Sequence, residues 1–369
     1  MNRALATVDL ECVRHNVGAL RQRLKAGCGF MAVVKADGYG HGAEPVARAC
    51  LDAGAEVLGV ATTAEALSLR RAGFTCPVVV LGPLTGAEIG EAIDADAEIA
   101  IWSLPFLRNL MGVAHSRGAS LRCHVKIDTG MRRLGLYPRH LIEFLDMLEP
   151  APEAELVGVM THFATADEED GDFFNYQLHA FEECVQTVLT TGVTPVFHAA
   201  NSAATLRSPG SHFDMVRCGI AIYGLSPFQG DAAADGLRPA LTLTSYIADV
   251  KELAEGDSVG YGRTWMAPRR TSVGIIPIGY GDGFSRRLSN RGQVLVGGVS
   301  RPVVGRVSMD QITVDLGPDP SIRAGEEAVL IGSQGDETIT AEEMAGLLET
   351  INYEVTCNLS SRVERRYTG

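Results

Sequence analysis

The stretch FMAVVKADGYGHG, residues 30–42, sets the pattern from which the fold is predicted. Its apolar, β-branched run ends at Lys35 and passes directly into a glycine-rich turn. A short continuous apolar run of this kind is typical of a strand buried on both faces of a parallel sheet. Because burial lowers the pKa of a lysine, Lys35 is a candidate base or Schiff-base nucleophile, although a snorkelling or salt-bridged lysine is the commoner case.

Eight apolar runs alternate with amphipathic segments in the first part of the chain. They span residues 30–36, 57–61, 78–81, 98–102, 121–127, 156–162, 196–200 and 215–223. Helix signals lie between them, among them a capping box of Thr62 and Glu65 and an apolar stripe from Phe174 to Val188 at helical spacing. Eight such repeats predict a (β/α)8 TIM-like barrel, and an open doubly wound sheet is less favoured because no GxGxxG follows the first run.

The second part of the chain is rich in predicted strands. They follow the small and polar residues 229–236 and span residues 241–250, 258–261, 271–278, 293–296, 303–307, 312–316 and 328–331. One helix is predicted, opened by Thr340 with Glu343 three residues later. We therefore expect an α/β chain of two domains, a barrel over residues 1–232 and a mostly β domain over residues 233–369.

The composition argues against several classes of protein. The 369 residues carry a formal net charge of -13, which disfavours nucleic acid or an anionic membrane surface as a partner. Eight cysteines are too few for a disulfide framework, and no Cys or His spacing suggests a metal site. Asp9 and Glu11 interrupt any signal peptide and no run of 18 apolar residues occurs, so a cytoplasmic protein without a membrane segment is expected.

Polar side chains follow several of the predicted barrel strands, at the end where barrel enzymes place their active sites. Arg133 is suited to bidentate capture of a carboxylate, although a surface arginine is the commoner case. Arg217 lies inside an apolar run and needs a partner, either a buried acceptor or a cofactor. Lone histidines at such positions, here His162 and His198, are most often structural.

Nine segments together resemble alanine racemase, a fold-type III pyridoxal-phosphate enzyme. They are KADGYGHG from Lys35, KIDTGMRRLG from Lys126, THFATADE from Thr161, HAANSAA from His198, VRCGIAIYG from Val216, VGYGRTW from Val259, IGYGDG from Ile278, GRVSMDQ from Gly305 and INYEV from Ile351. Each segment alone is weakly to moderately specific, but nine in order are strongly specific and cover nearly the whole chain.

The resemblance implies a role for each matching residue. Lys35 would bind pyridoxal phosphate covalently and act as acid and base on one face of the substrate, and Tyr261 of a partner subunit would act on the other. The cofactor would also contact Tyr39, His162, His198, Ser202, Arg217, Gly219, Ile220 and Tyr353. The substrate carboxylate would meet Arg133 and the backbone of Met309. Supporting residues would be Lys126, carbamylated in many family members, and Asp167, Tyr280, Arg306 and Ile351 along the access channel.

The implied activity is the interconversion of L- and D-alanine by a homodimer, supplying D-alanine for peptidoglycan. Proton removal from an amino acid needs an electron sink, and racemisation needs an acid and a base on opposite faces. Arg217 does not release its proton, so a ring nitrogen opposite it would stay largely unprotonated and the α-carbon would be reprotonated. One departure is Arg132, which stands where the family commonly has glycine and is expected to point to solvent.

Three other functions are considered. A serine or broader-specificity racemase differs only slightly in the size of its substrate. A pyridoxal-phosphate carrier built on the same barrel is less favoured, because the β domain and Tyr261 have no counterpart there. A fold-type III decarboxylase would carry a cysteine in a Gly-Pro-x-Cys-Asp setting, whereas Cys357 lies in Thr-Cys-Asn.

Overall fold

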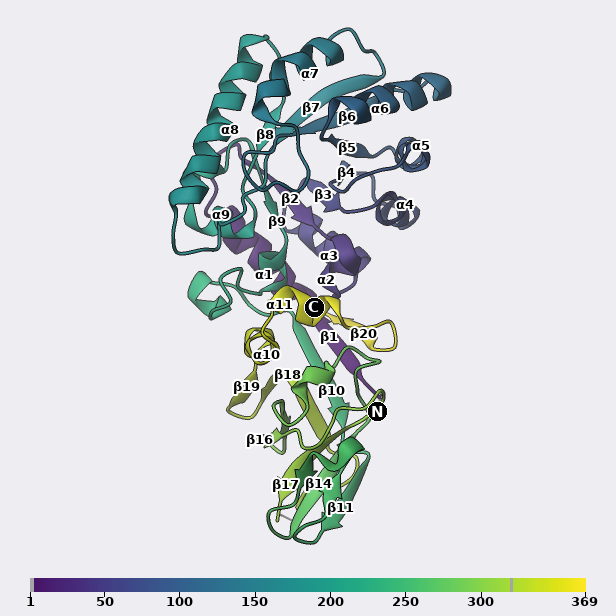
Figure 1. Cartoon of the computed structure of the whole chain (residues 1–369), viewed down its shortest axis with the longest axis vertical. Coiled ribbons are helices and arrows are strands. Elements are labelled where there is room, and N and C mark those ends of the chain that lie inside the picture. The colour runs from purple at the N-terminus through teal and green to yellow at the C-terminus, as the bar shows by residue number, and fades with distance from the viewer. Residues whose placement is uncertain (1–2, 319–320) are drawn as a thin grey trace.

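Eight parallel strands form an almost closed barrel in the computed structural model, which describes residues 3–318 and 321–369 (Figure 1). Their order in the sheet is β8-β7-β6-β5-β4-β3-β2-β9, so each strand from β2 to β8 lies beside the next one along the chain. The strands are β2 (Gly29–Val33), β3 (Val57–Val60), β4 (Val78–Val80), β5 (Glu98–Ile101), β6 (Leu121–Lys126), β7 (Ala154–Met160), β8 (Val196–His198) and β9 (Met215–Cys218). This confirms the predicted fold class and all eight predicted barrel strands.

Two backbone hydrogen bonds bridge the remaining gap between β8 and β9. The amide of Asp214 donates to the carbonyl of Phe197, and the amide of Arg217 donates to the carbonyl of Ala200, each at 2.9 Å. Arg217 is thereby held at the seam of the barrel, directly beside the end of β8. The last predicted strand is shorter than expected, because a 3-10 turn over Ile220–Tyr223 replaces its second half.

Helices surround the barrel and carry the predicted caps. They are α1 (Leu10–Arg21), α2 (Lys35–Tyr39), α3 (Ala43–Asp52), α4 (Thr63–Arg71), α5 (Gly86–Asp94), α6 (Leu104–Arg117), α7 (Leu141–Leu148), α8 (Asp172–Thr190) and α9 (Ser202–Arg207). The Thr62 and Glu65 capping box opens α4 as predicted, and the apolar stripe buries Phe181, Val185 and Val188 of α8. Within residues 3–318 and 321–369, no helix has the length and apolar character that a membrane crossing requires.

The second half is mostly β, as predicted. Its strands are β10 (Leu241–Tyr246), β11 (Asp249–Leu253), β12 (Ser258–Val259), β13 (Trp265–Met266), β14 (Thr271–Ile276), β15 (Gln293–Val296), β16 (Val299–Pro302), β17 (Ile312–Gly317), β18 (Glu327–Gln334), β19 (Glu337–Ile339) and β20 (Glu364–Thr368). β1 (Leu5–Asp9) precedes the barrel but pairs with β10 and β20, so the start of the chain contributes a strand to this sheet. The division at residues 232 and 233 stays a prediction.

Three local expectations in this half were wrong. Residues 303–307 form no strand, because only Val303 makes an isolated bridge to Val314, and the strand lies earlier, at β16. The run 241–250 is broken in two between β10 and β11. A second helix, α11 (Asn352–Cys357), follows α10 (Ala341–Leu348); α11 is short and has no side-chain cap, which leaves little signal in the sequence.

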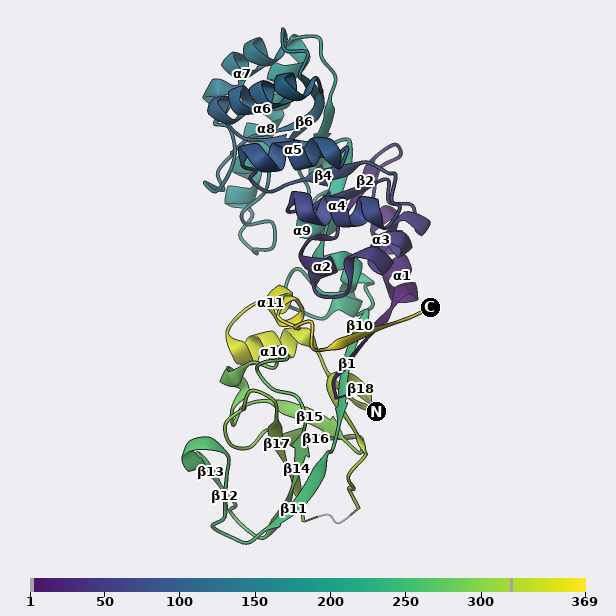
Figure 2. The ribbon, with the colours of Figure 1, turned by 90° about the vertical axis from the view of Figure 1, so that its right-hand side faces the viewer.

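The two halves meet where α11 lies against α2 and β20 lies against α1 (Figures 1 and 2). A Cβ atom on Gly40 would lie 2.1 Å from the carbonyl oxygen of Thr356, so this close backbone approach requires glycine. Arg365 also donates from Nε to the carbonyl of Gly40 at 3.2 Å. The junction therefore holds α11 at the mouth of the barrel.

Candidate active site

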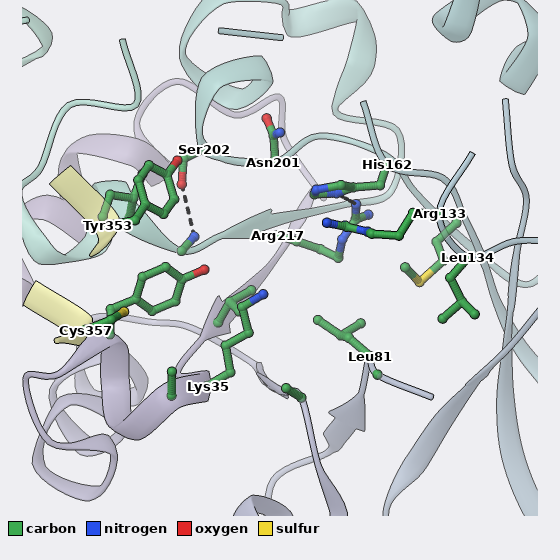
Figure 3. A pocket seen from close by; sticks show the side chains of 18 of the residues that line it. Lys35, Leu81, Arg133, Leu134, His162, Asn201, Ser202, Arg217, Tyr353 and Cys357 are labelled. Atoms are coloured by element: carbon green, nitrogen blue, oxygen red, sulfur yellow. Dashed lines mark hydrogen bonds between the residues drawn. The ribbon is translucent and has the colours of Figure 1, made fainter. Parts of the chain in front are cut away.

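A pocket of about 800 Å³ opens at the carboxyl ends of the barrel strands and is closed on one side by α11. Its polar lining comes from both halves of the chain: Lys35, Tyr39, Lys126, Arg133, His162, Asn201, Ser202, Arg217, Tyr353, Glu354 and Cys357. Figure 3 shows the Lys35 amine pointing into this space, between Ser202 and Tyr353 on one side and Arg217 and His162 on the other. The structure thus brings together most of the residues predicted for the cofactor.

Lys35 begins α2 directly after β2, at the start of a strained turn. Ala36, Asp37 and Tyr39 have φ values of 52°, 51° and 52°, a left-handed conformation that costs L-residues about 1–2 kcal/mol each. The carboxylate of Asp37 accepts the amide of Ala43 at 2.9 Å, which helps to hold the turn. Burial, followed by the charge of Arg133, lowers the pKa of the Lys35 amine. Strained backbone of this kind clusters at functional sites.

Hydroxyl and amide groups gather at one end of the pocket. The Gly219 amide donates to Ser202 Oγ at 3.0 Å, and the rings of Tyr39 and Tyr353 lie with centroids 6.0 Å apart. Burial raises the pKa of both tyrosines, so their hydroxyls stay protonated and can donate hydrogen bonds. A Cβ on Gly219 would lie 2.5 Å from Tyr39 Oη, so the backbone approaches closely here. Ile220 follows as the first residue of a 3-10 turn.

Arg217 occupies the other end, only 4% exposed. Its Nη2 donates to the carbonyls of Thr161 (2.7 Å) and Ala199 (2.9 Å) and lies 3.4 Å from Nδ1 of His162. Its Nη1 donates to the carbonyl of His198 (2.8 Å) and lies 3.3 Å from that residue's Nδ1. Within the described part of the chain Nε has no acceptor, and this donor remains available to a ligand.

Four basic side chains line this pocket, and none of them forms an ion pair with another described residue. They are Lys35, Lys126, Arg133 and Arg217. Burial lowers the pKa of Arg217 to about 10, which still leaves the guanidinium charged at neutral pH. Burial and the charges of Arg217, Arg133 and Lys35 lower the pKa of Lys126 to about 8. Burial and the same cations hold the pKa of His162 well below its ordinary value, so its ring is neutral. Such a site attracts anions in an otherwise acidic chain.

Arg132 points away from the pocket, in agreement with the expectation that it faces solvent. Its guanidinium lies over the ring of Tyr137, 5.0 Å from the centroid, and its Nη1 lies 3.9 Å from Oδ2 of Asp128. The residue has a φ of 55°, a left-handed conformation that glycine adopts freely. Ile351 lines the pocket, and the exposed Asp167 lies outside it.

Four predicted residues lie on the β half and do not line the pocket: Tyr261, Tyr280, Arg306 and Met309. Tyr261 is 69% exposed in a short turn and Met309 is 51% exposed. The residues lie in adjoining loops, since the amide of Tyr280 donates to the carbonyl of Ser308 at 3.1 Å and a Cβ on Gly262 would lie 2.8 Å from Nη1 of Arg306. Within one chain the structure does not bring them to Lys35.

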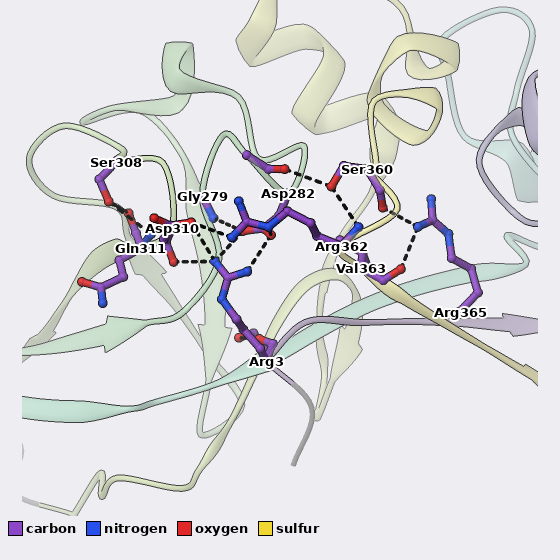
Figure 4. Close-up of polar contacts among 12 residues, drawn as sticks. Arg3, Gly279, Asp282, Ser308, Asp310, Gln311, Ser360, Arg362, Val363 and Arg365 are labelled. Carbon is purple, nitrogen blue, oxygen red and sulfur yellow. Dashed lines mark hydrogen bonds and ion pairs between the residues drawn. The ribbon is translucent and has the colours of Figure 1, made fainter.

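An ion-pair network of Arg3, Asp282, Asp310 and Arg362 holds the loops around Tyr280 and Met309 (Figure 4). Asp282 is completely buried, accepts the Gly279 amide at 2.9 Å and pairs with Arg3 and Arg362. Arg362 also pairs with Asp310 at 2.5 Å. The loops around Tyr280 and Met309 are therefore fixed to β1 and to the segment before β20.

Several residues at or near the pocket received no role in the sequence reasoning. Asn201, Glu354 and Cys357 line it, and Glu98 and His124 lie behind Arg217 in the barrel. Asn201 precedes α9 and accepts the amide of Ala204 at 3.0 Å, which is the pattern of a helix N-cap. The other residues carry no local signal, because their placement depends on the closure of the barrel and on the docking of α11.

Chemistry at the carboxyl ends of barrel strands is the shared property of (β/α)8 enzymes. The buried amine, guanidinium and hydroxyl groups at this mouth define the chain as an enzyme of that class. The profile of the family "Alanine racemase, N-terminal domain" matches residues 8–227, and that of "Alanine racemase, C-terminal domain" matches residues 240–367. The chain belongs to the alanine racemase family.

Individual relatives match over nearly their whole length. Alanine racemase from Symbiobacterium thermophilum is 44% identical over 365 residues, which are 99% of this chain and 97% of the relative. The structure of alanine racemase from Streptomyces lavendulae, which produces D-cycloserine, matches with a TM-score of 0.96 at 40% identity, covering 100% of this chain and 98% of that one. Alanine racemase from Bartonella henselae with covalently bound pyridoxal phosphate matches with a TM-score of 0.89 at 28% identity, covering 99% of each chain.

Proposed function

We propose that the chain interconverts L- and D-alanine with pyridoxal phosphate held at the mouth of the barrel. The observation that carries this proposal is the Lys35 amine, with its lowered pKa, in a cation-lined pocket of a full-length member of the alanine racemase family. A relative of this chain holds the same cofactor covalently. When bound, the cofactor supplies the electron sink that makes the α-proton of an amino acid acidic.

The donor groups of the pocket fit the two ends of this cofactor. We assign the phosphate to Tyr39, Ser202, Tyr353 and the backbone at Gly219 and Ile220, because protonated hydroxyls and main-chain amides suit a phosphate. We assign the pyridine nitrogen to Arg217, whose Nε lacks an acceptor among the described residues. His162 is assigned to the ring and His198 to the orientation of Arg217.

The acid and base assigned to the reaction are Lys35 and Tyr261. Lys35 takes or gives a proton on one face of the substrate α-carbon, which its lowered pKa favours. Tyr261 is assigned to the other face and must come from a second copy, since it is exposed on the β half and outside its own chain's pocket. The proposed enzyme is therefore a homodimer in which each site takes residues from both chains.

The substrate carboxylate is assigned to Arg133 and to the backbone at Met309 of the second copy. Lys126 is buried beside Arg133, and a carbamate on its amine would reverse its charge and orient that guanidinium. Asp167, Ile351, Tyr280 and Arg306 are assigned to the access channel. We further propose that the enzyme works in the cytoplasm and supplies D-alanine for peptidoglycan, as the family resemblance implies.

A visible absorption spectrum of the purified protein tests the cofactor assignment. Wild-type protein incubated with pyridoxal phosphate is expected to show the band of a lysine-bound cofactor, and borohydride is expected to abolish it and fix the cofactor covalently. Lys35→Ala is expected to show neither effect. A wild-type protein without the band refutes the cofactor assignment.

Substrate choice is tested by incorporation of solvent deuterium at the α-carbon. Alanine is expected to exchange faster than serine, because two tyrosine rings at the site favour a small substrate side chain. Tyr353 lines the pocket, and Tyr261 is assigned to it. A faster exchange of serine refutes the assignment of alanine as the main substrate and supports a serine or broader-specificity racemase.

A further inference from the structure

A chain of hydrogen-bonded side chains runs through the barrel behind the pocket. Glu98 Oε2 lies 2.8 Å from Nε2 of His124, and Nδ1 of His124 lies 2.9 Å from Nε2 of His198. Nδ1 of His198 in turn lies 3.3 Å from Nη1 of Arg217. The four residues come from β5, β6, β8 and β9, and all of them are buried.

The two ends of this chain fix the proton positions between them. Arg217 is a donor only, so its contact with Nδ1 of His198 is a hydrogen bond only when that nitrogen is unprotonated and His198 carries its proton on Nε2. His198 then donates to Nδ1 of His124, whose own proton lies on Nε2 and is donated to Glu98. Both imidazoles are neutral in this arrangement, and burial holds the pKa of His198 well below its ordinary value.

Glu98 supplies the negative end of the chain. It is 8% exposed; burial raises its pKa, but the His124 hydrogen bond and nearby cations outweigh that effect and lower it overall. Arg122 approaches Glu98 from the partly exposed side, with Nε 3.5 Å from Oε1. Among the described residues, the hydrogen-bond partners of Arg217 are carbonyl oxygens and imidazole nitrogens. The hydrogen-bonded series therefore links its buried charge to the Glu98 carboxylate through His198 and His124.

The lack of a side chain at Gly158 leaves space for the His124 ring. It lies on β7, between the strands of His124 and His198, and is in register with His124. A Cβ on Gly158 would lie 2.0 Å from Nδ1 and 2.6 Å from Cε1 of His124. That ring is hydrogen-bonded at both nitrogens and buried, so it has no free direction in which to move. A methyl group at residue 158 therefore blocks the contact without changing any titratable group.

We propose that Glu98 and His124 are positioning residues that fix the tautomer of His198, and through it the orientation in which Arg217 offers Nε to the pocket. The inference rests on the proposed function only in its last step, the use of Nε by the cofactor ring. The tautomer of His198 depends only on residues of this protein and can be measured whether or not the cofactor assignment is correct. Neither Glu98 nor His124 touches the pocket, so they act through His198 and Arg217.

Nitrogen-15 NMR of the histidine rings in wild-type holoenzyme is the first test. His198 is expected to show an unprotonated Nδ1 and a protonated Nε2, and His124 the same. A protonated Nδ1 on His198 in the wild type overturns the proposal without any variant. Absence of bound cofactor in the same sample would instead refute the proposed function and leave the tautomer measurement valid.

Three variants test whether Glu98 and His124 fix the tautomer of His198. Glu98→Leu removes the acceptor for His124 Nε2, so His124 can carry its proton on Nδ1 and donate it to Nε2 of His198. The proton of His198 is then expected on Nδ1, where it opposes the Arg217 donor. Cofactor affinity is expected to be about tenfold weaker and the visible band shifted, because one hydrogen bond to a charged group is lost. Gly158→Ala is expected to do the same. Glu98→Gln keeps an acceptor oxygen and is expected to restore the wild-type tautomer and most of the affinity.

The matched control is Glu153→Gln, which alters an exposed pair with His115 at a similar distance of 3.0 Å. It is expected to leave the tautomers, the visible band and the cofactor affinity unchanged. Suppose that Glu98→Leu and Gly158→Ala bind cofactor and racemise alanine within twofold of the wild type, and that Nδ1 of His198 stays unprotonated in both. The positioning role of Glu98 and His124 is then refuted, while the proposed function stands.

Discussion

Arg3 donates two hydrogen bonds to Asp282, from Nη1 to Oδ1 at 2.8 Å and from Nη2 to Oδ2 at 2.9 Å. The pair joins residues 279 positions apart in the sequence, since Arg3 lies just before β1 and Asp282 lies in the loop that carries Tyr280. Asp282 is completely buried and also pairs with Arg362, whose Nε lies 3.2 Å from Oδ1. One carboxylate therefore fixes the loop on which the proposed shared site depends.

Replacing this carboxylate is expected to destabilise the β half. Asp282→Asn removes the charge that compensates two guanidinium groups and is expected to cost about 2 kcal/mol, less than a fully buried pair because Arg3 is partly exposed. The measurement is the urea midpoint at a fixed protein concentration. Asp249→Asn, in an exposed pair with Lys251, is the control and is expected to leave the midpoint unchanged. Equal midpoints for the two variants would contradict this role of Asp282.

The barrel was predictable because its strands are short apolar runs that end in glycine or polar residues, as at Lys35. The membership of β1 was not, because Leu5–Asp9 pairs in parallel with Glu364–Thr368 at the far end of the chain. Local alternation indicates a strand but contains no information on a partner so distant. The 3-10 turn after β9 was missed for a related reason, since an apolar sequence fits either a strand or a tight turn.

The pocket was predictable only where a charged residue follows an apolar run or interrupts one. Lys35 and Arg133 follow such runs, and Arg217 lies inside one. Glu98 opens a predicted strand, where a charged residue suggests solvent, yet its carboxylate contacts His124 inside the barrel. That contact needs the space left by Gly158 on another strand, a condition that no local pattern expresses.

Cofactor binding is expected to require glycine at residue 219, because there is no room for a side chain there. In Gly219→Ala the new Cβ would lie 2.5 Å from Tyr39 Oη, so the tyrosine must leave the position proposed for the phosphate contact. Cofactor affinity is expected to fall tenfold or more, about 1.4 kcal/mol, measured by titration of the visible band. Gly210→Ala is the control, since a Cβ there meets nothing within 4 Å. Unchanged affinity in Gly219→Ala would argue against this position for the phosphate.

Lys126 is expected to react with carbon dioxide. Its pKa of about 8 leaves a substantial neutral fraction near pH 8, whereas a lysine at its reference value of about 10.4 is almost entirely protonated there. The neutral amine forms an N–C bond to CO2 and releases a proton, so carbamate should increase as pH rises through about 8. Carbon-13 NMR with labelled bicarbonate is expected to show one carbamate signal that Lys126→Met removes and Lys251→Met, at an exposed lysine, retains. A signal that survives Lys126→Met would refute the assignment.

The two neighbouring arginines are expected to differ sharply. Arg133 lines the pocket, and Arg133→Gln should raise KM for alanine and lower kcat/KM about 10- to 100-fold, the loss of one charge-assisted contact to a carboxylate. Arg132→Gln should stay within about threefold, because its guanidinium lies over Tyr137 and near Asp128. Steady-state kinetics with each variant decides the matter. The reverse order of effects would mean that Arg132 receives the substrate.

Tyr261→Phe is expected to keep the cofactor and lose racemisation. The ring is retained and only the hydroxyl that moves a proton is removed, so the visible band should match the wild type. The loss should be greater in the direction whose α-proton Tyr261 removes, which separate assays from L- and D-alanine measure. Tyr280→Phe, another exposed tyrosine of the β half, should retain far more activity. Wild-type rates in both directions for Tyr261→Phe would exclude it as a base.

Mixing two inactive variants tests whether Tyr261 acts across an interface. A two-fold dimer exchanges residues reciprocally, so a chain with Lys35→Ala and a chain with Tyr261→Phe form one site that lacks both groups and one intact site. Verified heterodimers are therefore expected to recover about half the wild-type activity per dimer, while each variant alone stays inactive. If Tyr261 acted within its own chain, every site of the heterodimer would lack one group and no activity would return. Tyr261 is exposed and does not line the pocket of its own chain, which favours the first outcome.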